Sequence, residues 1–195
     1  DDLQKSRNTS PMIIECDLEK LDEKQGQEIN DSILGSYGHL DAVINNASII
    51  GKMSSLSDYD LKTWNSVLNI NLTASFLLTK SLLPALTGSK MPRIIFTSSG
   101  VALTGRAFWG AYAISKAATK SMAEIFKEEL EGTSHIKVFN FDPGATRTSM
   151  RAFAYPAEDP SKLKEPRELL KCYEWLLSDE SKDANDLYFT FNSFN

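Results

Sequence analysis

The sequence has few cysteines and no long apolar run. Cys16 and Cys172 are the only cysteines among 195 residues, and neither has the close cysteine or histidine neighbours that a zinc site requires. No apolar run reaches the roughly 18 residues of a membrane span, and the polar segment 1–10 is unlike the hydrophobic core of a signal peptide. We therefore expect reduced cysteines, no metal site and a cytoplasmic protein.

The sequence also lacks an excess of basic residues, because it has 21 lysines and arginines and 26 aspartates and glutamates, which give a net charge of -5. Such a chain has no positive field to attract phosphate backbones or anionic lipid. Nucleic acid and membrane surfaces are therefore not expected as partners. The length suits a single packed core, and we expect one domain over residues 1–195.

Short apolar runs alternate with longer segments of helical periodicity. This pattern predicts strands at 12–16, 40–44, 93–97, 136–141 and 187–191, and helices at 21–37, 63–86, 110–131 and 167–177. Ser57 and Asp60 predict the start of the second helix, since their side chains can satisfy the free amides of a first turn. Parallel strands need crossover connections, so the alternation predicts an α/β fold with a parallel sheet between two helix layers.

Ligands of such sheets bind beyond the carboxyl ends of the strands. Polar or turn-forming residues occupy several of the predicted strand ends, namely Asp17, Asn45, Ser98, Ser99, Pro143 and Gly144. We therefore expect the binding site to lie where these residues gather.

Tyr112 and Lys116 stand four residues apart in the helix predicted at 110–131, which puts both on one face, one turn apart. A phenol with a pKa of about 10 is a poor base at neutral pH, but a nearby cation favours the phenolate and lowers that pKa. The pair could then exchange a proton with an alcohol or a carbonyl compound. The spacing alone is not specific, because an amphipathic helix also presents tyrosine and lysine to solvent.

Four further elements accompany this pair in a fixed order: Asn-Asn-Ala-Ser at 45–48, Asn71, Ser99, and Pro-Gly-Ala-Thr-Arg-Thr at 143–148. With them the sequence resembles the short-chain dehydrogenase/reductase family from about Met12 to the C-terminus. The family's Asn-Asn-Ala-Gly, Asn, Ser, Tyr-x-x-x-Lys and Pro-Gly-x-x-x-Thr elements recur in this order at similar separations. The segments 105–112 and 146–151 resemble a bacterial subgroup of uncharacterised oxidoreductases within it.

The resemblance implies a Rossmann-type, doubly wound fold and NAD(P)-dependent hydride transfer between nicotinamide and a small-molecule carbonyl or secondary alcohol. Tyr112 would be the general acid/base, and Lys116 would lower its pKa and hold the nicotinamide ribose. Ser99 would steady the reacting oxygen, and Asn71 would anchor a water that links Lys116 to solvent. Hydride transfer to a carbonyl leaves an alkoxide that needs a proton and hydrogen-bond donors nearby. Taken singly, Ser99 could instead cap a loop, and Asn71 could bond to backbone.

The resemblance also implies where the dinucleotide would lie. Asp17 would meet the adenine, and Asn45, Ala47 and Ser48 would line the adenine and its ribose. Ser48 departs from the family's usual glycine, which lets backbone approach a ligand closely. The loop that follows the strand at 136–141 would contact the carboxamide and phosphates of the nicotinamide half through Pro143, Gly144, Thr146 and Thr148.

The glycine-rich turn that holds the pyrophosphate in dinucleotide-binding folds is not found, because none of the ten glycines forms such a cluster. We therefore expect the first two strands of the fold to be missing, through truncation or in a degenerate relative that serves as a binding or scaffold protein. The residue that separates NAD from NADP would lie in the same part, so the sequence does not reveal the cofactor preference. A serine hydrolase is excluded, because no Gly-x-Ser-x-Gly elbow occurs.

Two predicted helices, 63–86 and 110–131, carry more apolar surface than one face of a sheet can cover. We therefore expect a homodimer or homotetramer that buries the surplus through the helices containing Asn71 and Tyr112. Phe76→Glu or Leu83→Glu is expected to weaken this association, provided that the substituted position lies on the outward face of the helix.

The loop at 146–166 combines arginines with apolar and aromatic side chains, namely Arg147, Met150, Arg151, Phe153 and Tyr155. Such a composition suits an apolar or aromatic substrate that carries an anionic group. A solvated surface loop has the same composition, so the substrate stays open.

Overall fold

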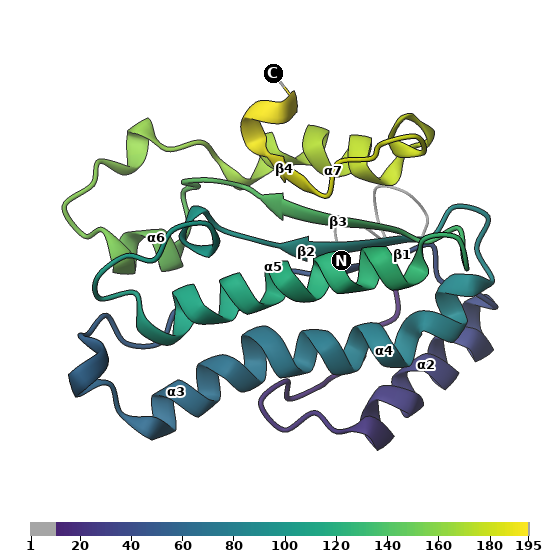
Figure 1. Ribbon diagram of the computed structural model, residues 1–195, viewed down its shortest axis with the longest axis horizontal. Coiled ribbons are helices and arrows are strands. Elements are labelled where there is room, and N and C mark those ends of the chain that lie inside the picture. The colour runs from purple at the N-terminus through teal and green to yellow at the C-terminus, as the bar shows by residue number, and fades with distance from the viewer. Residues whose placement is uncertain (1–10, 195) are drawn as a thin grey trace.

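A parallel sheet of four strands forms the centre of the protein. The structure is a computed structural model that describes residues 11–194. Each strand pairs in parallel with the next in the order β1 (Ala42–Asn45), β2 (Arg93–Thr97), β3 (Lys137–Asp142) and β4 (Tyr188–Thr190). The carboxyl ends of the strands therefore open together at one end of the sheet, on the left in Figure 1.

Helices lie on both sides of the sheet (Figure 1), which confirms the predicted three-layer α/β fold. One side carries α2 (Glu23–Tyr37), α3 (Leu61–Leu68), α4 (Ala74–Thr87) and α5 (Gly110–Leu130), and the other carries α7 (Leu170–Leu177). The short helix α6 (Ser149–Ala154) lies beyond the carboxyl ends of the strands. Short 3-10 turns complete the chain at η1 (Leu56–Asp58), η3 (Gly100–Ala102), η4 (Pro160–Lys162), η5 (Pro166–Leu169), η6 (Asp179–Ser181) and η7 (Phe191–Phe194). Within residues 11–194, no helix is both long and apolar enough to cross a membrane.

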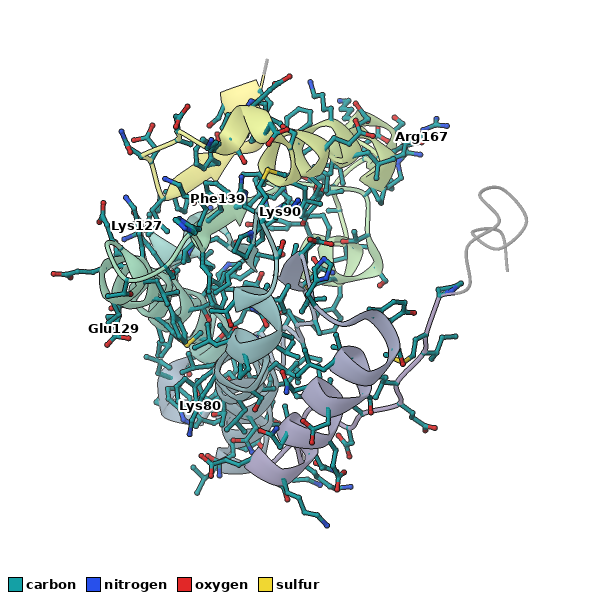
Figure 2. The ribbon with its side chains drawn as sticks, turned by 90° about the vertical axis from the view of Figure 1, so that its right-hand side faces the viewer. Lys80, Lys90, Lys127, Glu129, Phe139 and Arg167 are labelled. Atoms are coloured by element: carbon teal, nitrogen blue, oxygen red, sulfur yellow. The ribbon has the colours of Figure 1, made fainter. Side chains whose placement is uncertain are left out.

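Alternate side chains of the central strands build two separate hydrophobic layers. Ile94 and Phe96 pack with residues of α4 and α5, whereas Ile95 packs with Phe139 against α7. In Figure 2, Phe139 lies inside the molecule, whereas Lys127 and Glu129 of α5 point outward. Each fully buried large apolar side chain contributes roughly 1.5–3 kcal/mol, and burial on both faces explains why the strands read as continuous apolar runs.

The helix predicted at 63–86 is interrupted in its middle. A π-helical turn of five residues, η2 (Asn69–Thr73), joins α3 to α4. The wider turn brings Asn71 to the inside of the molecule, where it is 1% exposed. Single π-helical turns of this kind often occur at functional sites, and this one lies beside the helix that carries Tyr112.

The strand predicted at 12–16 is not formed, and this prediction is wrong. The described part of the segment is irregular, and Ile13 is 91% exposed. A strand requires a hydrogen-bonded neighbour, but β1 pairs only with β2 among the described residues. The apolar run therefore has no strand partner, although its composition matches that of β2.

Two other sequence-based positions need correction. The second helix begins at Leu61, because Asp60 is its N-cap and accepts a hydrogen bond from the amide of Thr63 at 2.8 Å. Ser57 lies instead in η1. Leu83 does not face outward, since its side chain packs against the core formed by α4, α5 and the sheet.

Candidate active site

The turn before α5 fixes the direction of the Tyr112 side chain. Phe108 has a φ of 71°, a left-handed conformation that is unfavourable for a bulky residue. Gly110 follows with a φ of 34°, and a side chain there would meet the ring of Tyr59 at 2.5 Å. The first turn of α5 therefore starts in a tightly determined position, with Trp109 and Tyr112 facing the hollow beside β2.

Tyr112, Ser99 and Lys116 meet at the end of β2, as the sequence predicts. The hydroxyl of Ser99 lies near the phenol of Tyr112, where it favours the phenolate and so acts to lower the pKa of Tyr112. Lys116 Nζ lies 5.7 Å from the centre of the Tyr112 ring and donates a hydrogen bond to the backbone oxygen of Thr97 at 2.8 Å. The arrangement puts a proton donor, a hydroxyl and a cation side by side.

Burial determines the protonation of this pair. It raises the pKa of Tyr112, to which the charge of Asp142 adds, while the bond from Ser99 acts in the opposite direction. Burial also lowers the pKa of Lys116 to about 8, against the effect of Asp142. The sequence predicts a lowered pKa for Tyr112, and the structure differs because desolvation of the phenol dominates. Tyr112 therefore holds its proton at neutral pH.

The side chain of Asn71 joins the loop after β1 to α5. Its Oδ1 accepts from the amide of Ile49 at 2.8 Å, and its Nδ2 donates to the backbone oxygen of Ile49 at 2.9 Å and to Ser115 Oγ at 3.0 Å. The backbone oxygen of Asn71 accepts from Ser75 Oγ at 3.2 Å. Both ends of the amide are thus bonded to protein, and the water-anchoring role stays a prediction.

Asn71→Ala is expected to lower the free energy of unfolding by about 1–3 kcal/mol, because the part-buried backbone of Ile49 and the buried hydroxyl of Ser115 lose their hydrogen-bond partner. Urea unfolding measures the change. Asn65→Ala, at an exposed position of α3, which η2 continues, is the matched control and should stay within about 0.5 kcal/mol of the parent. Equal stabilities of the two variants would contradict the bracing role of Asn71.

A cleft of about 1260 Å³ opens at the carboxyl ends of the strands. Most of the predicted site residues line it, namely Ala47, Ser48, Ser99, Tyr112, Lys116, Pro143, Gly144, Thr146 and Thr148. Asn45 is directed elsewhere, since its Nδ2 bonds Thr79 Oγ1 at 2.9 Å. Asp17 lies outside the cleft in an exposed ion pair with Lys20 at 3.0 Å.

The two turns of the cleft differ in their need for glycine. Gly144 has a φ of 66°, and its amide donates to Asp142 Oδ1 at 2.8 Å, so this turn requires the conformational freedom of glycine. Ser48, which replaces the family's usual glycine, has no left-handed backbone. Its hydroxyl is buried without a hydrogen-bond partner among the described residues. The serine therefore fits without backbone strain.

The sequence identified only part of the aromatic and basic wall of the cleft: it pointed to Arg151 and Tyr155 of the predicted substrate loop, and it gave no role to Arg106 and Trp109. Trp109 and Arg106 line the cleft from the loop before α5, and Tyr155 and Arg151 from the segment around α6. The run Arg-Ala-Phe-Trp before Tyr112 was the available signal. Two residues of the predicted substrate loop lie elsewhere: Arg147 pairs with Glu165 at 3.2 Å, and Phe153 is 58% exposed, and neither lines the cleft.

The parallel sheet, with a cleft beyond the carboxyl ends of its strands, is of the Rossmann type, in which ligands bind at that end. A family profile described as short chain dehydrogenase matches residues 1–159. The chain belongs to this family, as its motifs predict.

Within the family, the chain is similar to bacterial proteins. The uncharacterized oxidoreductase YciK of Escherichia coli (strain K12) is 38% identical over 179 residues, which cover 92% of this chain and 70% of the relative. This confirms the predicted likeness to a bacterial subgroup of uncharacterised oxidoreductases.

Solved structures of related dehydrogenases have the same fold. A short chain dehydrogenase from Salmonella enterica subsp. enterica serovar Typhi str. CT18 has a TM-score of 0.94 and 37% identity, over 97% of this chain and 78% of the other. Another, from Shigella flexneri 2a str. 301 and complexed with NADP, has a TM-score of 0.94 and 36% identity, over 98% of this chain and 79% of the other.

Proposed function

We propose that this protein is an NADP(H)-dependent oxidoreductase that interconverts a carbonyl compound and the corresponding secondary alcohol, with Tyr112 as general acid/base. The observation that carries the proposal is the meeting of Tyr112, Ser99 and Lys116 in one cleft beyond the strands. Family membership supports the reaction class, and the NADP complex of the Shigella flexneri relative supports the cofactor.

Each of the three side chains has a role in the proposed reaction. In the direction of reduction, NADPH, when bound, would supply the hydride that adds to the carbonyl carbon. Tyr112 donates its phenolic proton to the carbonyl oxygen, so that the product is an alcohol and Tyr112 becomes a phenolate. The hydroxyl of Ser99 donates a hydrogen bond to the same oxygen, and the ammonium of Lys116 stabilises the phenolate. Because burial raises the pKa of Tyr112, the phenol starts out protonated at neutral pH, which suits reduction.

The dimensions of the cleft support a nicotinamide and a substrate side by side. Its volume of about 1260 Å³ exceeds the roughly 300–1,000 Å³ of ordinary small-ligand pockets. We propose that Lys116 holds the ribose hydroxyls of the nicotinamide half. The turn at Pro143 and Gly144, with Thr146 and Thr148, would face the carboxamide and the phosphates. Ala47 and Ser48 would line the adenine half.

The test is a screen of aldehydes and ketones with NADPH and NADH, using the full-length protein that the gene encodes. We expect oxidation of NADPH with at least one carbonyl compound, and slower oxidation of NADH with the same compound. Cofactor binding is measured in parallel by calorimetry. Absence of cofactor binding, together with no oxidation in the presence of any carbonyl compound, would contradict the enzyme and favour the scaffold alternative, which lacks the cofactor's phosphate site.

We also propose that the protein associates through the outer faces of α4 and α5. Phe76 of α4 is 41% exposed, and Ile114 and Ile125 of α5 are 41% and 52% exposed. Large apolar side chains on the outside of a helix layer are covered when the same face of a second copy packs against them. Such contact between identical faces is the usual geometry of homodimers.

Phe76→Glu is expected to weaken this association by about tenfold or more, because a carboxylate would have to be buried in an apolar interface. Sedimentation velocity over a range of protein concentrations measures the effect. Thr87→Glu, at the exposed end of the same helix, adds the same charge outside the proposed contact and should sediment like the parent. A parent protein that stays monomeric at every concentration would rule the interface out.

A further inference from the structure

We infer that Arg106 forms an anion-binding subsite at the mouth of the cleft, which receives a carboxylate group of the carbonyl substrate. This inference rests on the proposed function, because it places the reacting carbonyl at Tyr112. Three features carry it: the pairing of the two arginines in the cleft wall, the hydrogen-bonding capacity left to Arg106, and the aromatic side chains between Arg106 and Tyr112.

Two arginines approach Tyr155 from opposite segments of the chain. Arg106, from the loop before α5, donates a hydrogen bond from Nη1 to the phenol oxygen of Tyr155 at 2.7 Å. Arg151, from α6, lies over the Tyr155 ring with its guanidinium carbon 3.8 Å from the ring centre. All three side chains line the cleft, so the wall beyond the strands carries two guanidinium groups.

Only one of these two charges is balanced by the protein. Arg151 binds Glu158 in a bidentate ion pair, with Nε and Nη2 each 2.6 Å from a carboxylate oxygen. Among residues 11–194, no carboxylate lies within ion-pair distance of Arg106. The protein therefore neutralises Arg151 internally and leaves the charge of Arg106 to the cleft.

Arg106 also keeps most of its hydrogen-bonding capacity. A guanidinium has five N–H donors in a planar fork, and within the described part of the chain its one hydrogen bond is that to Tyr155. The fork matches the two oxygens of a carboxylate, and the resulting charge-assisted bonds are stronger than neutral ones. In a protein with a net charge of -5, such a position selects anions locally.

Aromatic side chains connect this charge to the reacting group. The Trp109 ring centre lies 5.7 Å from that of Tyr112 and 5.9 Å from that of Tyr155. One indole therefore spans the distance between the proton donor and the partner of Arg106, and Ile50 and Met150 extend the apolar lining. A matching substrate has its carbonyl at Tyr112, a flat apolar body on Trp109 and a carboxylate at Arg106, which describes an aromatic or unsaturated oxo acid.

The test compares two ligands that differ only in charge, 4-formylbenzoate and its methyl ester, by calorimetry with the full-length protein. We expect the parent to bind the acid about tenfold more tightly than the ester, because charge-assisted hydrogen bonds from the guanidinium to a carboxylate are stronger than those to a neutral ester. Arg106→Gln should abolish the preference and leave the ester's affinity unchanged. Arg106→Lys, which keeps the charge without the fork, should retain part of it.

Arg147→Gln is the matched control, because it removes the same charge from a nearby loop whose arginine does not line the cleft. It should keep the full preference for the acid. Equal affinities of the parent for acid and ester, or an equal loss of both in Arg106→Gln, would overturn the inference. A loss of NADPH affinity alone in Arg106→Gln would assign the guanidinium to the cofactor and also overturn it. Ligand binding requires no hydride transfer, so failure of the proposed reaction is distinguishable from failure of this subsite.

Discussion

Tyr112→Phe is expected to lower the turnover number of the full-length enzyme by about 10²-fold or more, with the fold intact. The substitution removes a single oxygen, and the ring keeps its packing against Val101 and Trp109. The substrate oxygen then has no proton donor, although the Ser99 hydroxyl can still bond it. Steady-state kinetics with NADPH should show the loss in kcat, with little change in KM.

The control for this experiment is Tyr37→Phe, which removes a phenol oxygen from an exposed tyrosine at the end of α2, outside the cleft. Its turnover should equal that of the parent. Thermal unfolding of both variants separates a chemical effect from a loss of structure. An unchanged kcat in Tyr112→Phe would remove Tyr112 from the reaction and with it the proposed mechanism.

The sequence predicts those elements whose burial is encoded locally. The run at 93–97 has three consecutive apolar residues at its centre, Ile94, Ile95 and Phe96, and it forms β2 with the predicted bounds. The helical pattern at 110–131 becomes α5 to within one residue. The run at 12–16 is just as apolar, yet it forms no strand, because pairing depends on a neighbour that no local pattern reveals.

The features of the candidate site likewise fall into those that the sequence predicted and those that it did not. The order and spacing of the motifs predicted that Ser99, Tyr112 and Lys116 lie together, as they do in the cleft. The π-helical turn at Asn71 was not predictable, since its composition is that of an ordinary helix. The direction of the pKa shift of Tyr112 was not predictable either, because the spacing of Tyr112 and Lys116 reveals their proximity but not their burial. Arg106 was not predicted as a site residue, because it stands in an exposed loop well beyond β2 in the sequence, where composition does not show which side chains face the cleft.

The buried ammonium of Lys116 lowers the free energy of unfolding of the protein. The side chain is only 4% exposed. Its ammonium donates a hydrogen bond to the Thr97 oxygen, and no carboxylate of the described residues lies at ion-pair distance from it. Burial lowers its pKa from 10.5 to about 8, so the folded protein binds this proton more weakly than the unfolded chain does. Below pH 8 both states are protonated and the penalty is complete. Between about pH 8 and 10.5 the folded state releases the proton first, so stability rises with pH through that window.

Lys116→Met is therefore expected to raise the free energy of unfolding at pH 7 by about 1–3 kcal/mol while it lowers turnover by about 10²-fold or more. Methionine fills a similar volume without a charge, so the rise in stability between about pH 8 and pH 10 should disappear. Urea unfolding at neutral and alkaline pH measures both effects. Lys120→Met, one turn later and paired with Glu124 at the surface, is the matched control and should bring no gain. In this account the fold is less stable because it buries a charge that the reaction needs. A Lys116→Met variant that is less stable than the parent at pH 7, or that keeps its turnover, would refute it.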